Sequence, residues 1–208
     1  MTRIKYCGMT RVSDALLAAR LGVDAIGLVF SVRSRRQVSV EQARVIRCAL
    51  PPFISCVALF MDDDKALVDN VITIVRPDLL QFHGRESAPW CASFGLPWIK
   101  AIAMGDVPAA LTDLRCYPRA AGLLLDGHHL GEAGGSGKCF DWAWVPSDLA
   151  QPLILAGGLH AGNVGAAIHQ LRPWAVDVAS GVESAPSIKD ADRMTAFVAS
   201  VRRADKTN

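Results

Sequence analysis

Two side chains capable of acid–base chemistry stand at the ends of short apolar segments. Cys7 follows Arg-Ile-Lys-Tyr, and Asp126 follows Gly-Leu-Leu-Leu. Thiol and carboxyl groups both carry protons in enzyme active sites. Each residue also has a structural interpretation, because cysteine is often a small buried apolar residue and aspartate often caps a loop or a helix. Position alone favours packing for Cys7 and leaves both interpretations open for Asp126.

Glycine-rich motifs follow the last three apolar segments. These motifs are Gly134-Gly135-Ser136-Gly137, Gly157-Gly158 and Ser180-Gly181. Glycine lets backbone N–H groups approach an anion closely, as a phosphate site requires. Tight turns are the alternative for Gly157-Gly158 and Ser180-Gly181, but their positions after consecutive segments favour phosphate binding.

Other polar residues near the segment ends carry weaker signals. Taken alone, His83 is typical of a core histidine, and the arginines within residues 33–36 are typical of a solvated loop. Asp177 lies within the last apolar segment. His128 and His129 are adjacent and have no clear third ligand, so we expect a surface loop rather than a metal site.

The apolar segments are predicted to be strands that bring these side chains together. They are apolar almost throughout, which is typical of parallel strands covered by helices. Their residues are 3–7, 25–30, 56–60, 79–83, 98–101, 122–126, 153–156 and 176–180. Between them, stretches such as residues 12–19 place apolar side chains on one helix face. We expect Thr10 to cap that helix, Gly22 to end it, and the final helix to begin near Lys189.

Eight strands alternating with helices predict a single (β/α)8 barrel, or TIM barrel, over residues 1–208. The alternative is an open doubly wound sheet, disfavoured because no GxGxxG motif follows the first strand. In such a barrel the carboxyl ends of the strands meet at one mouth, where the active site forms. Residues 127–138 are the longest irregular stretch, and a loop of this length is often functional.

Composition excludes several classes of protein. The 208 residues carry a net charge of only +2 with the basic residues dispersed, so nucleic acid is not an expected partner. No apolar run approaches the roughly 18 to 20 residues of a membrane span, and residues 1–7 do not resemble a signal peptide. We therefore expect a cytoplasmic protein whose six cysteines, which show no CxxC spacing, are free thiols.

These motifs, in this order, resemble phosphoribosylanthranilate isomerase from end to end. The matching segments are Lys5-Tyr6-Cys7-Gly8-Met9-Thr10-Arg11, Ala25-Ile26-Gly27-Leu28-Val29-Phe30, Arg33-Ser34-Arg35-Arg36, Gln81-Phe82-His83-Gly84, Leu124-Leu125-Asp126, residues 134–142, Leu155-Ala156-Gly157-Gly158-Leu159, Asn163-Val164 and residues 177–184. The resemblance implies an Amadori rearrangement of N-(5-phosphoribosyl)anthranilate to the corresponding 1-deoxyribulose 5-phosphate, within tryptophan biosynthesis. It implies no metal or other cofactor, because the substrate nitrogen serves as the electron sink.

The resemblance also assigns roles to individual residues. It implies that Cys7 is the general base and Asp126 the general acid, and that Arg36 faces the anthranilate carboxylate. The further residues of the implied site are His83 and Asp177 for substrate binding, and Gly157, Gly158, Ser180 and Gly181 for the phosphate. The chemistry requires a lowered pKa for Cys7, for which we consider the helix starting after Thr10, and a raised pKa for Asp126.

Three departures from the family pattern are present. The family often has Pro-Arg-Tyr where this chain has Arg35-Arg36-Gln37, so the carboxylate contact could move between the two arginines. Ser187 stands where the family often has glycine. A glycine there can take a positive φ that serine rarely adopts, so Ser187 calls the family's loop conformation into question. Ser136 replaces threonine and keeps the hydroxyl.

The alternatives are two related phosphate-binding barrel enzymes and one protein without catalytic activity. Indoleglycerol-phosphate synthase is disfavoured because its catalytic lysines are not evident at matching strand ends. The histidine-pathway Amadori isomerase has an aspartate in the first strand, where this chain has Cys7. A catalytically inactive phosphosugar-binding barrel or scaffold is disfavoured because Cys7 and Asp126 are both intact. A monomer and a homodimer are both compatible with the sequence.

Overall fold

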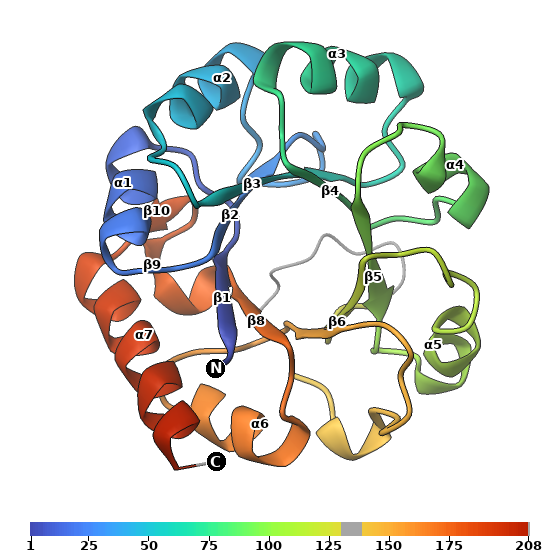
Figure 1. Cartoon of the computed structure of the whole chain (residues 1–208), viewed down its shortest axis with the longest axis vertical. Helices are drawn as coiled ribbons and strands as arrows, with labels where there is room; N and C mark the ends of the chain where they lie inside the picture. Colours follow the sequence, from blue (N-terminus) through green and yellow to red (C-terminus); the bar gives the residue numbers. More distant parts are fainter. Residues whose placement is uncertain (130–138, 208) are drawn as a thin grey trace.

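Eight parallel strands close into a barrel in the computed structural model, which describes residues 1–129 and 139–207 (Figure 1). The strands pair in sequence order, and β8 pairs with β1. They are β1 (Arg3–Tyr6), β2 (Ala25–Val29), β3 (Ser55–Phe60), β4 (Leu79–Phe82), β5 (Trp98–Ala103), β6 (Gly122–Asp126), β7 (Leu153–Leu155) and β8 (Ala175–Val178). The predicted (β/α)8 barrel is confirmed, and the open doubly wound sheet is wrong.

Helices form an outer ring around the barrel in Figure 1. The α-helices are α1 (Val12–Arg20), α2 (Val40–Ala49), α3 (Lys65–Val75), α4 (Ala88–Ala92), α5 (Val107–Asp113), α6 (Val164–Leu171) and α7 (Ala191–Lys206). The 3-10 helices of the described residues, η1 (Trp142–Trp144) and η2 (Ser180–Val182), follow β6 and β8. None of the helices in the described ranges is long and apolar enough to cross a membrane.

Residues alternate along each strand between two apolar cores. Ile4 and Tyr6 of β1 face the layer between strands and helices, which holds most of the buried apolar residues. Lys5 lies on the opposite face, inside the barrel, where its Cα pairs in register with that of Asp177 on β8. The interior below the mouth is filled by a smaller apolar cluster of Ile99, Ala101, Leu124, Ile154, Ala156 and Ala175. The polar side chains near the carboxyl ends of the strands therefore lie above a well-packed apolar layer.

Capping side chains and glycine explain several helix ends, but the predicted starts of α1 and of the final helix differ from the structure. Ser39 and Asp64 accept bonds from the backbone N–H groups of the first turns of α2 and α3. Gly22, with φ of 74°, follows the end of α1 as predicted. The prediction that Thr10 caps α1 is wrong, since Arg11 occupies that position without a side-chain cap.

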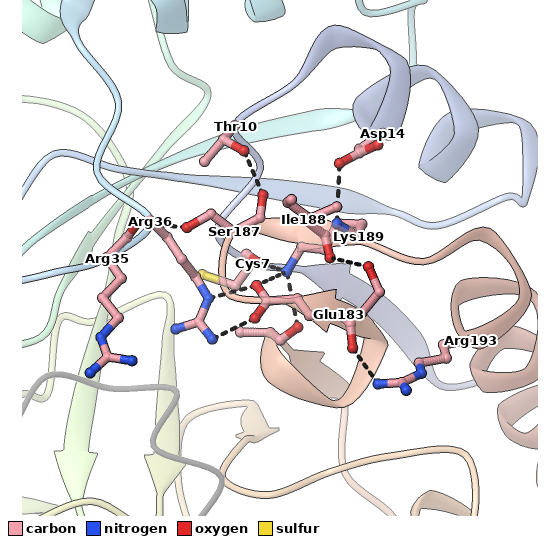
Figure 2. A network of polar contacts seen from close by, with 12 residues as sticks. Cys7, Thr10, Asp14, Arg35, Arg36, Glu183, Ser187, Ile188, Lys189 and Arg193 are labelled. Atoms are coloured by element: carbon pink, nitrogen blue, oxygen red, sulfur yellow. Dashed lines mark hydrogen bonds and ion pairs between the residues drawn. The ribbon is translucent and has the colours of Figure 1, made fainter.

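The final helix begins at Ala191, because Ile188–Lys189 instead form β10 (Ile188–Lys189). This strand pairs with β9 (Glu183–Ala185) in a two-stranded antiparallel sheet. Asp190 then accepts a bond from the Arg193 backbone N–H at the start of α7. The short sheet carries Glu183 and Lys189 to the mouth of the barrel, next to the end of β1 (Figure 2).

Ser187 adopts the positive φ that its replacement of glycine called into question, with a value of 69°. Its hydroxyl donates to the Arg35 carbonyl at 2.6 Å, and its own carbonyl accepts from the Thr10 hydroxyl at 2.7 Å (Figure 2). The side chain thus links the turn after β9 to the loop after β2. These bonds compensate a non-glycine residue in the left-handed region.

Replacing Ser187 separates the strain from the hydrogen bond. Ser187→Ala should lower the free energy of unfolding by about 1 kcal/mol, because it keeps the strained φ and loses the bond to Arg35. Ser187→Gly loses the same bond but relieves about 1 kcal/mol of strain, so its stability should match the parent chain. Urea denaturation compares the three proteins. A glycine variant less stable than the alanine variant would contradict this account.

Candidate active site

A cavity opens at the carboxyl ends of the strands and is lined by most of the predicted site residues. The predicted residues that line it are Cys7, Arg36, His83, Asp126, Gly157, Gly158, Asp177 and Ser180. Apolar walls come from Val29, Leu59 and Met61, among others. Cys7 and Asp126, from the ends of β1 and β6, therefore face a common space.

The loops after β7 and β8 contain the predicted phosphate-binding residues. Gly157 and Gly158 have φ values of 84° and 61°, a region that residues with a side chain rarely adopt. Gly181 does not line the cavity. A Cβ atom at Gly181 would clash with the Leu159 carbonyl oxygen, so this glycine lets the two loops pack against each other. The predicted motif at residues 134–137 lies outside the described residues.

Cys7 is buried beside two lysines. The Lys5 ammonium forms an ion pair with Asp177 at 3.0 Å and lies next to the Cys7 side chain, while Lys189 Nζ donates to the Cys7 carbonyl at 2.6 Å. Gly27 on β2 makes room for this arrangement. A Cβ there would lie 2.9 Å from Cys7 Sγ and 3.2 Å from Lys5 Nζ.

The predicted lowering of the Cys7 pKa is not found. Burial raises the pKa of the Cys7 thiol above its ordinary value, and Lys5 and Lys189 oppose this effect only in part. The groups that favour the thiolate are therefore these lysines rather than the start of α1. Burial opposes the charge of Lys5, but Asp177 and Cys7 keep its pKa above the ordinary value, so Lys5 is an ammonium ion.

Asp126 lies between two imidazole rings. Its Oδ2 is 3.7 Å from His83 Nε2 and 3.5 Å from His128 Nδ1. Burial alone would raise the pKa of Asp126, but His128 and His83 hold it below the ordinary value, the reverse of the predicted direction. Burial and His128 lower the pKa of His83 to about 3, so His83 is neutral.

The prediction that His128 lies on a surface loop is wrong. Its exposed fraction is 1%, and its ring stacks on that of His83 with centroids 4.5 Å apart. His129, the next residue, is exposed as predicted. The chain therefore turns inward directly after β6 and places His128 against a residue from the end of β4.

Arg36 binds a buried glutamate at the mouth of the barrel (Figure 2). Its Nε and Nη2 donate to the two Glu183 oxygens at 2.7 and 2.8 Å, and Lys189 Nζ donates to the same carboxylate at 3.0 Å. A guanidinium group has five N–H donors, so its Nη1–Nη2 edge can still bind a second carboxylate. Figure 2 shows that the Arg35 side chain points away from Glu183. Arg36 rather than Arg35 is thus held at the cavity, where Gly8 leaves the space that its side chain fills.

Four residues of this arrangement are absent from the predicted site, namely Lys5, His128, Glu183 and Lys189. A signal was available for Lys5, because it is two residues from Cys7 on one strand and must share its face. The sequence held no such signal for Glu183 and Lys189, because their partners are distant along the chain.

Comparisons with known proteins agree on one family. A family model described as N-(5'phosphoribosyl)anthranilate (PRA) isomerase matches residues 4–200. The N-(5'-phosphoribosyl)anthranilate isomerase of Stenotrophomonas maltophilia (strain R551-3) is 51% identical over 209 residues, covering 99% of this chain and 95% of that protein. The same enzyme of Stutzerimonas stutzeri (strain A1501) is 48% identical over 202 residues, covering 97% of this chain and 98% of that protein.

Solved structures give the same result. Phosphoribosyl anthranilate isomerase from Thermotoga maritima superimposes with a TM-score of 0.90 at 37% identity, covering 98% of this chain and all of that chain. A phosphoribosyl anthranilate isomerase in complex with reduced 1-(o-carboxyphenylamino)-1-deoxyribulose 5-phosphate has a TM-score of 0.83 at 34% identity, covering 98% and 100% of the two chains. The chain therefore belongs to the phosphoribosylanthranilate isomerase family.

Proposed function

We propose that this protein catalyses the Amadori rearrangement of N-(5-phospho-β-D-ribosyl)anthranilate to 1-(2-carboxyphenylamino)-1-deoxy-D-ribulose 5-phosphate in tryptophan biosynthesis. The observation that carries the proposal is that Cys7 and Asp126 line one cavity in a chain of this family. The cavity is walled by apolar side chains and has polar groups at separate points, which suits a phosphorylated sugar joined to an aromatic ring.

In the proposed mechanism Asp126 acts first. Its carboxyl group donates a proton to the furanose ring oxygen, the C1–O bond breaks, and the anthranilate nitrogen supplies the electron pair that forms an iminium ion. The Cys7 thiolate then removes the proton from C2, and the C2–H electrons form the enolamine, which tautomerises to the ketone. The substrate nitrogen accepts and returns the electrons, so the mechanism requires no metal or other cofactor.

The remaining predicted residues would hold the two ends of the substrate. The loops after β7 and β8, with Gly157, Gly158 and Ser180 on the cavity wall, would bind the phosphate through backbone N–H groups. Gly181 would contribute by keeping these loops together. The free Nη1–Nη2 edge of Arg36 would bind the anthranilate carboxylate, with Glu183 fixing the guanidinium plane.

The pKa directions imply an unusual protonation state. The competent form has a neutral Asp126 and an anionic Cys7, whereas burial and the histidines favour the opposite distribution. Both forms carry the same net charge, so their ratio does not change with pH between the two pKa values. The rate should therefore show a plateau whose height falls about tenfold for each pKa unit that separates the two groups.

Lys5→Met should lower this plateau and move the basic limb of the kcat/KM profile to higher pH. Among the residues that the structure describes, the charged groups that act on the thiol include Lys5, Lys189, Asp177 and Arg36. Loss of the Lys5 ammonium raises the Cys7 pKa, so fewer thiolates form and the limb at which Cys7 loses its proton shifts upward. Asp177→Asn removes an anion and should shift the limb downward. If Lys5→Met lowers kcat/KM equally at every pH and leaves both limbs of the profile at the same pH, Lys5 does not set the pKa of the Cys7 thiol.

The direct test of the proposed function is a fluorescence assay that follows loss of phosphoribosylanthranilate. Purified, folded protein should turn the substrate over, and no turnover above the uncatalysed rate would reject the function. The T. maritima enzyme is described as dimeric. For this chain, a monomer or homodimer and a cytoplasmic location stay predictions.

A further inference from the structure

Three buried side chains from different parts of the chain converge beside the cavity. Asp126 ends β6, His83 follows β4, and His128 lies in the loop after β6. One ligand atom from each lies within 4.8 Å of the other two. Their exposed fractions are 6% for His83, 5% for Asp126 and 1% for His128.

Each of the three side chains has a buried polar atom without a hydrogen-bond partner among the described residues. These atoms are His83 Nε2, Asp126 Oδ1 and His128 Nδ1. A buried polar atom that lacks a partner costs roughly 1–3 kcal/mol, so three at one point are exceptional. The proposed mechanism uses the Asp126 carboxyl and transfers no proton through the two imidazole nitrogens.

The donor set selects one class of ligand. Two imidazoles and a carboxylate suit Zn²⁺ and its neighbours Co²⁺ and Ni²⁺, whereas Mg²⁺ and Ca²⁺ prefer oxygen alone. Bonds of about 2.0–2.1 Å in a tetrahedron place donor atoms about 3.3 Å apart. The observed separations of Asp126 Oδ2 from the two histidine nitrogens, 3.7 and 3.5 Å, are close to that value.

One ring must turn for both nitrogens to face a common ion. The imidazoles stack with 26° between their planes, and a metal lies in the plane of the ring that binds it. Rotation about the Cβ–Cγ bond of histidine has a broad energy minimum. His83 lines both the catalytic cavity and a second cavity that it shares with His128, and its rotation would break the 3.3 Å contact of its Nδ1 with Gln81 Nε2.

We propose that His83, Asp126 and His128 bind one divalent transition-metal ion, with Zn²⁺ as the best fit, and that the ion inhibits the enzyme. The inhibition rests on the proposed function, because a metal-bound Asp126 carboxylate cannot carry the proton that the ring oxygen needs. His83 and Asp126 both line the catalytic cavity, so an ion bound to them would lie at its wall, where the substrate must reach Asp126. Substrate and metal should therefore compete.

Cobalt provides a readout independent of activity. Titration of the whole chain with Co²⁺ should give visible d–d absorption that saturates at one equivalent and is displaced by Zn²⁺. Zn²⁺ should inhibit turnover competitively with substrate, and EDTA should restore the rate. An intense near-ultraviolet thiolate-to-cobalt band would assign the metal to Cys7 or an exposed cysteine and overturn the proposal.

His128→Phe is the decisive variant, because phenylalanine keeps a ring against His83 and removes the donor nitrogen. Its affinity for Co²⁺ should fall tenfold or more, because losing even a hydrogen-bond partner of a metal ligand typically costs about 10- to 100-fold in affinity. His169→Phe, on the surface of α6, is the matched control and should bind Co²⁺ as the parent does. Equal Co²⁺ affinity in His128→Phe and the parent would overturn the site. If His128→Phe lacks a folded circular dichroism spectrum, Asp126→Asn replaces it in the same titration, with the same expectation.

The two proposals fail in distinguishable ways. A protein that binds Co²⁺ through these residues but does not turn over phosphoribosylanthranilate retains the metal site and loses the proposed function. A protein that turns over substrate but shows no saturable Co²⁺ spectrum loses the metal site and keeps the function.

Discussion

Asp126→Asn is expected to lower kcat by about 10²- to 10⁴-fold, the usual contribution of a general acid. Asparagine has the size of aspartate and can occupy the same place between His83 and His128. It cannot release a proton to the furanose ring oxygen, so ring opening loses its acid. Because the change affects only the chemical step, affinity for the reduced product analogue should change little.

The measurement pairs single-turnover kinetics with a binding titration of that analogue. Loss of kcat with retained binding identifies an acid, whereas parallel loss of both indicates a collapsed cavity. Thermal unfolding supplies the control for folding. Activity of Asp126→Asn within tenfold of the parent would exclude Asp126 as the acid.

Cys7→Ser is expected to lower kcat by a similar factor, since a serine hydroxyl is far less acidic than a thiol and does not form an anion near neutral pH. The oxygen fills nearly the space of Sγ beside Gly27, so packing is kept. Cys7→Ala should be equally inactive but leaves a small void under Lys5. Agreement between the two variants would show that the missing group is the base.

Alkylation provides the second readout for Cys7. Reaction of the thiol with iodoacetamide should abolish activity, and the product analogue should protect it, because Cys7 lines the cavity. Cys48, Cys116 and Cys139 are exposed and should react without loss of activity, and Cys7→Ser labelled in parallel counts the adducts that do not involve Cys7. An active Cys7→Ala protein would remove the residue from the mechanism.

The strands could be predicted because the information they require is local. A segment such as Gly122–Asp126, apolar until its last residue, can be buried on both faces only in a parallel sheet with helices outside it. The same periodicity located α1 and the glycine that follows it. Predicted ends differed by a residue or two where a distant partner intervened. Thr10 bonds to Ser187 instead of capping α1, and Lys189 joins a strand instead of a helix.

Charged partners inside the mouth could not be predicted, because each pair joins distant parts of the chain. Lys5 meets Asp177 only because β8 closes the barrel against β1 in the observed register. Arg36 meets Glu183 only because the β9–β10 sheet folds over the end of β1.

The sequence by itself determined the barrel, the family and eight of the residues that line the cavity, since those depend on local periodicity and on motifs. Only the tertiary structure decided the electrostatics. Burial raises the pKa of Cys7, two imidazoles lower that of Asp126, and the inward turn of His128 creates the cluster proposed to bind metal. The physical reason is that a pKa depends on solvent exclusion and on charges a few ångströms away, and both are set by contacts between distant strands.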